Sequence, residues 1–253
     1  MRVIAIANQK GGVGKTATVL NLGAALAAMG ERVILVDLDA QANLTTIAGV
    51  EEVELSSYDL LLSNDIGLRD VVQSTPYENL LIVPAEDTLA AAEVQLADAD
   101  QRQDRLRVKL DPVAEDTWVI IDTPPSLGFL TINALTAATD ALIPVQCSYL
   151  AMQGLRALLG TIETVRERSN PDLRLLGVLL TMYDARTRHS RQVVERLSEH
   201  FGDAVFKAMI PRSVAFDYAT VAAQPLVHFR GTSAGAEAYR KLAREVRKRA
   251  QES

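Results

Sequence analysis

The sequence predicts an α/β fold, with a doubly wound, mostly parallel sheet flanked by helices. Short β-branched runs alternate with longer helical patterns along the 253 residues. The β-branched runs are apolar on both faces, which is typical of strands covered on both sides. The composition is 48% hydrophobic and 23% charged, which excludes disordered and fibrous chains. We expect one domain over residues 1–253, with ligands at the carboxyl ends of the strands.

The expected strands are short runs rich in Val, Ile and Leu, each bounded by polar or turn-forming residues. They are, in chain order, Val3–Asn8, Val33–Asp37, Leu80–Pro84, Trp118–Asp122, Ala141–Val145, Leu175–Thr181 and Val205–Ile210.

The expected helices combine Ala, Leu and charged residues at helical spacing. Gly30 ends the first of them, and Asn170-Pro171 ends the long one before it can continue. Residues 89–110 are dense in charge and predict one or two surface helices. The set is Lys15–Met29, Tyr58–Leu62, Leu68–Val72, Leu89–Leu110, Leu130–Ala138, Leu150–Arg168, Ser190–Phe201 and Ala234–Gln251.

Membrane and metal-cluster classes are excluded by two simple features. No apolar run approaches the roughly 18 residues that span a bilayer, and the amino end lacks the pattern of a signal peptide. Cys147 is the one cysteine, so a single chain can form neither an internal disulfide nor a Cys-rich metal site. We therefore expect a cytoplasmic protein without stable membrane insertion.

Charge is distributed unevenly along the chain. The net charge of −6 divides into −11 over residues 1–183 and +5 over residues 184–253. An acidic body with a basic last quarter can still present a local surface for an anionic ligand, so residues 184–253 are a candidate DNA-facing region. Charge alone favours the simpler interpretation, a solvated helix surface.

The most informative stretch is residues 8–16, NQKGGVGKT, which follows a predicted strand and opens a predicted helix. Glycines allow successive backbone N–H groups to face phosphate oxygens, and the helix amino end adds partial positive charge. Lys15 can reach the β- and γ-phosphates, and the Thr16 hydroxyl can bind Mg²⁺. The usual P-loop pattern would have glycine at position 9, where this chain has Gln9, and Lys10 is an additional lysine.

This loop resembles the deviant Walker A motif of the ParA/MinD family of P-loop ATPases. Residues 36–43, VDLDAQAN, are similar to the first switch of that family, and residues 120–128, IIDTPPSLG, to its Walker B strand and second switch. Four further segments resemble the ParA/Soj partitioning branch in particular. They are residues 131–135 (TINAL), 143–147 (IPVQC), 177–186 (GVLLTMYDAR) and 210–212 (IPR).

The resemblance implies a slow, Mg²⁺-dependent ATPase that forms a homodimer with ATP. Such a dimer would bind double-stranded DNA without sequence preference, associate with the nucleoid and act with a ParB-like activating protein in chromosome or plasmid segregation. A MinD-like ATPase that acts on a membrane or protein cargo is the alternative. Its membrane helix would need bulky apolar residues in the tail, where Tyr239, Leu242, Val246 and Ala250 instead suit a helix docked on the body.

The resemblance also assigns roles in turnover. Lys15 and the loop N–H groups would hold the nucleotide, Lys10 would reach the phosphates of the other protomer, and Asp39 would orient the attacking water. Asp122 ends an apolar strand, which points to a Mg²⁺ site that includes Thr16. Asp37 is either a support for Mg²⁺ or a cap of the next helix. The expected nucleotide-contacting residues are Lys10, Gly11, Gly12, Val13, Gly14, Lys15, Thr16 and Ala17.

Base and DNA contacts rest on shorter similarities. The loop with Ile-Pro-Arg lies beside adenine in the family, so the expected base contacts are Thr181, Met182, Pro211, Arg212 and Ser213. Soj-like proteins carry a second arginine shortly afterwards, where this chain has Ala215. Compensating DNA contacts are expected from Arg186, Arg188, Arg191 and Arg230, with the tail cluster Arg244, Arg247, Lys248 and Arg249 as further candidates.

Overall fold

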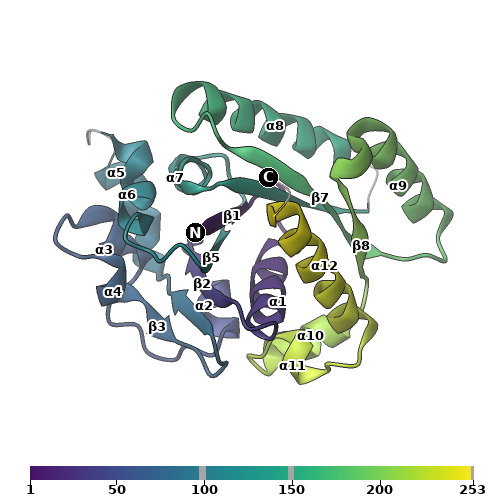
Figure 1. Cartoon of the computed structure of the whole chain (residues 1–253), viewed down its shortest axis with the longest axis horizontal. Helices are drawn as coiled ribbons and strands as arrows, with labels where there is room; N and C mark the ends of the chain where they lie inside the picture. The colour runs from purple at the N-terminus through teal and green to yellow at the C-terminus, as the bar shows by residue number, and fades with distance from the viewer. Residues whose placement is uncertain (97–100, 148–150, 252–253) are drawn as a thin grey trace.

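A computed structural model describes residues 1–96, 101–147 and 151–251. Their strands form an eight-stranded sheet in the order β3-β4-β2-β5-β1-β6-β7-β8, which confirms the predicted fold class (Figure 1). Every adjacent pair is parallel except β3 and β4, which are antiparallel. The strands are β1 Arg2–Ile6, β2 Arg32–Asp37, β3 Gln73–Ser74, β4 Leu80–Val83, β5 Thr117–Asp122, β6 Asp140–Gln146, β7 Arg174–Tyr183 and β8 Val205–Pro211.

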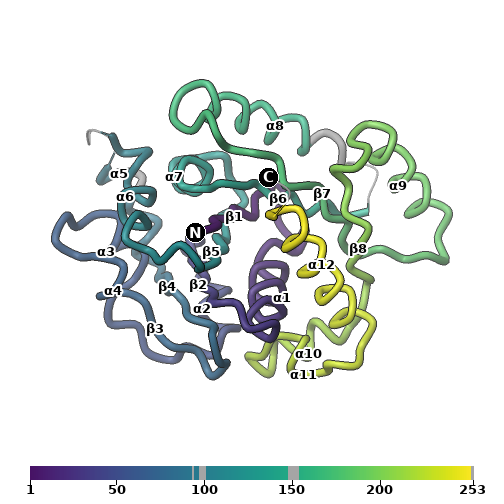
Figure 2. Tube along the Cα trace, viewed as in Figure 1, coloured from purple at the N-terminus to yellow at the C-terminus, as the bar shows by residue number. Residues whose placement is uncertain are grey.

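Helices cover both faces of the sheet, with a hydrophobic core on each side. One core packs under α1 (Lys15–Ala27), α2 (Asn43–Ile47), α10 (Ala215–Val221), α11 (Leu226–Phe229) and α12 (Ala234–Gln251). The other lies under α3 (Ser57–Leu62), α4 (Leu68–Val71), α5 (Ala92–Gln95), α6 (Arg105–Leu110), α7 (Phe129–Ala137), α8 (Ala151–Arg168) and α9 (Arg188–Phe201). Figure 2 shows α12, in yellow, running beside α1, in purple.

All seven predicted strands are present, with ends that differ by at most two residues. Of the one or two surface helices expected over Leu89–Leu110, the structure has two short ones rather than one continuous helix. The segment consists of the 3₁₀ turn Asp87–Ala91, α5, the 3₁₀ turn Arg102–Asp104 and α6, with residues 97–100 outside the described part. The buried apolar side chains form two separate groups, Leu89, Ala92 and Leu96 before residues 97–100 and Leu106 and Leu110 after them, which suits separate short elements. Leu150, the expected start of the next helix, also lies outside the described residues.

Four short elements were not predicted: α2, β3, α10 and α11. Each has between two and seven residues, so none spans enough chain to show a clear hydrophobic period.

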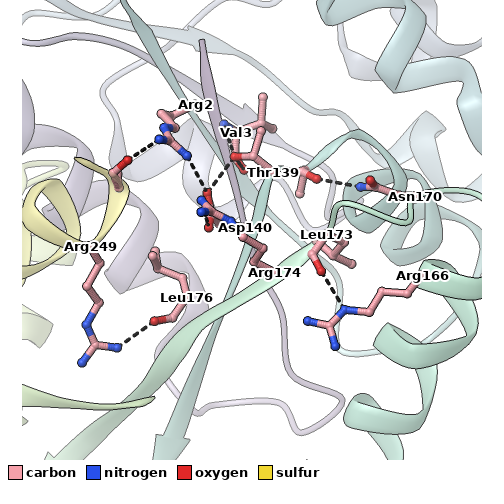
Figure 3. Close-up of polar contacts among 12 residues, drawn as sticks. Arg2, Val3, Thr139, Asp140, Arg166, Asn170, Leu173, Arg174, Leu176 and Arg249 are labelled. Atoms are coloured by element: carbon pink, nitrogen blue, oxygen red, sulfur yellow. Dashed lines mark hydrogen bonds and ion pairs between the residues drawn. The ribbon is translucent and has the colours of Figure 1, made fainter. Parts of the chain in front are cut away.

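A buried carboxylate joins the amino ends of three strands. Asp140 is 2% exposed and lies at the start of β6. Its Oδ1 accepts from Arg174 of β7 at 2.7 Å, while Arg2 of β1 lies 3.9 Å from Oδ2 (Figure 3). Arg2 also donates to the carbonyl of Ala250, so the clamp reaches α12. A buried charge paired in this way holds its partners in a fixed register.

A second clamp fixes the last turn of α12. The Arg249 guanidinium donates to the Leu176 carbonyl at 2.7 Å (Figure 3). It also lies 4.1 Å from the centre of the Phe206 ring. It also donates to the carbonyls of Asp203, Ala204 and Val205. Arg249, expected among possible DNA contacts of the tail, therefore has an internal structural role.

The other tail arginines also make local ion pairs. Arg247 lies 3.5 Å from Glu31, and Arg244 lies 3.0 Å from Glu237. The tail cluster is thus engaged with the body and with its own helix, and it does not form a separate basic surface of unpaired arginines.

The Arg249 clamp predicts that Gly177 cannot carry a side chain. A Cβ there would lie 2.5 Å from the Ala204 carbonyl oxygen and 2.5 Å from an Arg249 nitrogen. We expect Gly177→Ala to lower the free energy of unfolding by about 1–3 kcal/mol through overpacking. Urea denaturation measures this change.

The matched control is Gly160→Ala in α8, where a new Cβ meets nothing within 4 Å. Alanine has the higher helix propensity, so this variant is expected to gain about 0.5–1 kcal/mol. An equal loss of stability in both variants would contradict the packing argument.

Candidate nucleotide site at the carboxyl edge of the sheet

The glycine-rich loop connects β1 to α1 and is held from two neighbouring strands. Asn8 donates from Nδ2 to the Pro144 carbonyl of β6 at 2.7 Å and accepts from the Lys10 N–H at 3.0 Å. The Thr181 hydroxyl of β7 donates to the Val13 carbonyl at 2.8 Å. The loop is thereby attached to the sheet at both ends, and Asn8 is a positioning residue to which the sequence reasoning gave no role.

The backbone of the loop takes a shape that requires glycine. Gly12 and Gly14 have φ values of 71° and 87°, which side chains disfavour. Gly14 is the N-cap of α1, and no side chain caps the helix there. The first N–H groups of α1 are therefore left to an external acceptor, and this end of a helix favours an anion.

Lys15 opens α1 and is only 7% exposed. Burial lowers the pKa of its ammonium group, and the nearby carboxylates of Asp122 and Asp39 partly oppose that change. A cation in this position is desolvated and would gain strongly from a phosphate beside it.

Asp122 ends β5 and is 1% exposed. Neither of its carboxylate oxygens has a hydrogen-bond partner in the described part of the chain. Burial first, and then the neighbouring Asp37, raise the pKa of Asp122 well above its usual value, while the nearby Thr16 hydroxyl and Lys15 oppose this. A buried carboxyl group without donors is costly unless a cation satisfies it.

The oxygen donors present fit Mg²⁺. Thr16 and Asp122 offer one hydroxyl and one carboxylate, and no group of three His, Cys, Asp or Glu side chains that could hold a metal occurs among the described residues. Mg²⁺ commonly takes one or two protein oxygens and completes its shell with waters and phosphates. The site therefore suits a metal that arrives with a nucleotide better than one held by the protein alone.

Asp37 has a different environment. Its Oδ1 accepts from the Asp39 N–H at 3.1 Å, and its Oδ2 accepts from the Thr45 N–H at 3.0 Å and hydroxyl at 2.8 Å. Burial raises the pKa of Asp37 to about 6. These bonds hold the first turn of α2, as the capping alternative predicts, while its metal role stays a prediction.

The two residues expected to act in turnover lie at the rim of the loop. Asp39 follows β2, is half-buried, and accepts from the Gln41 N–H at 3.1 Å. Lys10 is exposed, and its Nζ donates to Gln146 Oε1 at 3.3 Å. The Asp39 carboxylate is close enough to Lys15 to oppose the lowering of the Lys15 pKa.

A cavity of about 340 Å³ adjoins the loop. It brings together all five expected base contacts with Gly14 and Ala17, and its volume is within the range of small-molecule pockets. The lining residues that sequence reasoning missed are Ile210, Val214, Phe216, Asp217 and Tyr239.

Tyr239 links this cavity to the loop. Its hydroxyl lies 3.2 Å from the Thr18 hydroxyl, which donates to the Gly14 carbonyl at 2.7 Å. Its ring meets Phe216 edge-on, with centroids 6.0 Å apart. The sequence marks Tyr239 only as an apolar position of the last helix, so its place in the cavity depends on α12 packing against α1.

The expected DNA residues do not all lie together. Arg188 and Arg191 are exposed on the first turn of α9, and Arg186 precedes it. Arg186 forms a two-pronged contact of 2.9 Å with Asp184 and lowers the pKa of that carboxyl to about 2. Arg230 instead follows α11, which Figure 1 shows at the bottom of the view, away from α9.

Two further expectations concern the region after the Ile-Pro-Arg segment and the tail. Ala215 is 6% exposed on the core side of α10, a place that does not suit an arginine side chain.

Tyr239, Leu242, Val246 and Ala250 are at most 4% exposed, which confirms that α12 docks on the body. In the described chain, no helix is long and apolar enough to cross a membrane.

Comparison with known proteins leads to the same family as the sequence of the glycine-rich loop. A family model described as an AAA domain matches residues 1–175. The sporulation initiation inhibitor protein Soj of Bacillus subtilis is 48% identical, and the match covers 97% of this chain and 98% of Soj. The chromosome partitioning protein ParA of Caulobacter vibrioides is 45% identical, and the match covers 97% and 94%.

Solved structures share the fold over nearly the whole chain. A Mycobacterium smegmatis protein described as cobyrinic acid a,c-diamide synthase, with bound ADP and magnesium, is 40% identical with a TM-score of 0.87, covering 99% of this chain and 96% of that one. The cell division ATPase MinD of Pyrococcus furiosus is 25% identical with a TM-score of 0.80, covering 98% of both chains. The chain belongs to the ParA/Soj family of P-loop partitioning ATPases.

Proposed function

We propose that this protein hydrolyses ATP with Mg²⁺ and acts in chromosome or plasmid segregation as an ATP-dependent, DNA-binding dimer. The observation that carries the ATPase proposal is the buried, unpartnered carboxylate of Asp122 beside Thr16 and Lys15. The related M. smegmatis structure, with bound ADP and magnesium, supports the choice of ligands. Partitioning follows from Soj and ParA, which share more identity with this chain than that structure does.

Catalysis would come mainly from positioning and charge. The N–H groups of residues 11–16 and the Lys15 ammonium would hold the phosphates, and Mg²⁺ beside Thr16 and Asp122 would neutralise charge that develops in transfer. Asp39 would orient the attacking water. Lys10 would reach the phosphates of a second protomer and so make hydrolysis depend on the dimer.

DNA binding would depend on the same dimer. The monomer carries a net charge of −6, so one copy of the Arg186, Arg188 and Arg191 cluster is a weak anion site. Two copies on one dimer offer six arginines for phosphates. A ParB-like activator would then stimulate hydrolysis and release the DNA, and binding to DNA would concentrate the protein on the nucleoid.

Lys15→Ala tests the phosphate site. Removal of the buried ammonium is expected to weaken ATP binding about 100-fold or more, because two or more charge-assisted hydrogen bonds are lost. Isothermal titration with ATP and Mg²⁺ measures the affinity, and a thermal melt checks folding. Thr16→Ser, which keeps the hydroxyl, is the control and should bind almost normally. Unchanged affinity in Lys15→Ala would refute the site.

Asp39→Ala and Lys10→Ala separate the two turnover roles. Asp39→Ala should bind ATP and dimerise but hydrolyse it poorly, since the phosphate cradle stays intact. Lys10→Ala should lose both hydrolysis and the ATP-dependent dimer. Phosphate release and sedimentation with ATP give the two readouts, with Asp65→Ala as an exposed control. Wild-type turnover in Asp39→Ala, or a wild-type dimer in Lys10→Ala, would exclude the corresponding role.

Replacement of Arg186, Arg188 and Arg191 by Glu should abolish DNA retention and leave basal ATPase activity largely intact. For the wild-type dimer, neutralisation of six phosphates gives a slope of log K against log[salt] of about −5. DNA binding should require ATP and should not depend on the DNA sequence. The charge-matched control replaces exposed Arg69, Arg156 and Lys241 by Glu. If the control lost DNA equally, net charge and not this cluster would explain binding.

A further inference from the structure

Helix α10 carries an exposed apolar stripe. Val214, the N-cap residue of α10, and Tyr218 and Val221 of the helix are 68%, 55% and 88% exposed. Their spacing of i, i+4 and i+7 places them along one face. They make up half of the large hydrophobic side chains that are exposed in the described residues. Ala215 and Ala219 of the same helix are buried against the body. The apolar arc of α10 is therefore wider than the part that the body covers.

A cation lies over the middle of this stripe. The guanidinium carbon of Arg230 is 5.4 Å from the centre of the Tyr218 ring and 5.7 Å from that of Phe229. Within residues 1–96, 101–147 and 151–251, no carboxylate forms an ion pair with Arg230. The two rings hold the charge in place, and it stays available to an acidic group outside the chain.

We propose that Val214, Tyr218, Val221 and Arg230 form a docking surface for a helical segment of a partner protein. The segment would present apolar side chains at i, i+4 and i+7 to the stripe and an acidic side chain to Arg230. Its spacing follows from that of the stripe, because short helices recognise one another through such rows. Its charge follows from Arg230, whose electrostatic complement is a carboxylate.

DNA is the less suitable occupant of this surface. Two of the three stripe residues are valines, which gain nothing from phosphate oxygens and much from contact with other apolar side chains. Interfaces between proteins are typically enriched in aromatic residues and arginine among apolar side chains, which is the composition found here. The surface shares Arg230 with the expected DNA contacts but lies apart from the arginines on α9. Val221→Glu leaves Arg230 in place and so tests the surface separately from the proposed DNA function.

The surface adjoins the nucleotide site. Val214 lines the base cavity and also belongs to the stripe, and Phe216, two residues further along the chain, packs against Tyr239 in the cavity wall. A segment docked on α10 would therefore contact the same loop that closes over the base.

Selection from a phage-displayed library of short helical peptides tests the proposal. The full-length wild-type protein is the target, and peptides that also bind Val221→Glu are removed. The selected peptides should carry apolar residues at i, i+4 and i+7 beside Asp or Glu. A synthetic peptide of that sequence should bind wild type about tenfold more tightly than Val221→Glu in fluorescence anisotropy.

Two further variants test whether the peptide binds at this surface. Val108→Glu changes a valine that is 61% exposed on α6, and it should bind the peptide like wild type. Arg230→Glu should weaken binding, and a peptide with Lys in place of its acidic residue should restore it. ATP binding and DNA retention by Val221→Glu should equal those of wild type, which separates this surface from the proposed function.

Selection of peptides without the pattern, or equal binding by wild type and Val221→Glu, would overturn the proposal. Loss of DNA retention in Val221→Glu, with no selected peptide, would show that the stripe belongs to the DNA surface instead.

Discussion

Two buried carboxylates at the same level of adjacent strands set the constraint around which the nucleotide site is built. Asp37 ends β2 and Asp122 ends β5, and the parallel register pairs them directly. Two charges this close and this deeply buried repel unless each is satisfied. The chain satisfies Asp37 with three donors from the following loop and helix, and it leaves Asp122 to Lys15, Thr16 and a cation. At this edge of the sheet, Asp37 therefore holds the following loop and helix in place, while Asp122 stays available to a cation.

The opposite edge of the same sheet is treated differently. There Asp140 is fully paired with Arg174 and lies near Arg2, so the amino ends of β1, β6 and β7 hold no unsatisfied carboxylate. The Asp140 and Arg249 clamps both lie at that end. The end that faces the nucleotide keeps unpaired donors and acceptors, and it depends on the rigid sheet to hold them in position.

The sequence was sufficient for the parts of the fold that rest on local pattern. Seven strands, the first and last helices and the glycine loop each follow from periodicity or from glycine placement. Asn8 and Tyr239 could not be found in this way, because their roles depend on Pro144 and Thr18, far away in the chain. The sequence left two roles open for Asp37, and only the position of Thr45 in the structure shows that Asp37 caps α2. The contacts of Arg249 inside the protein could be recognised only once the path of α12 across β7 and β8 was known. The exact division of residues 89–110 into short helices and 3₁₀ turns could not be predicted, because the spacing of charged residues does not show which side chains are buried.

The contact between Tyr239 and Thr18 has a consequence for how the protein is made. The glycine loop is synthesised before α12, which supplies Tyr239 to the cavity and Arg249 to its clamp. Two residues separated by 221 positions must meet before the cavity is complete. A nascent chain therefore has its glycine loop well before α12 can complete the cavity, and a ligand of that cavity would favour the folded state only once α12 has been made.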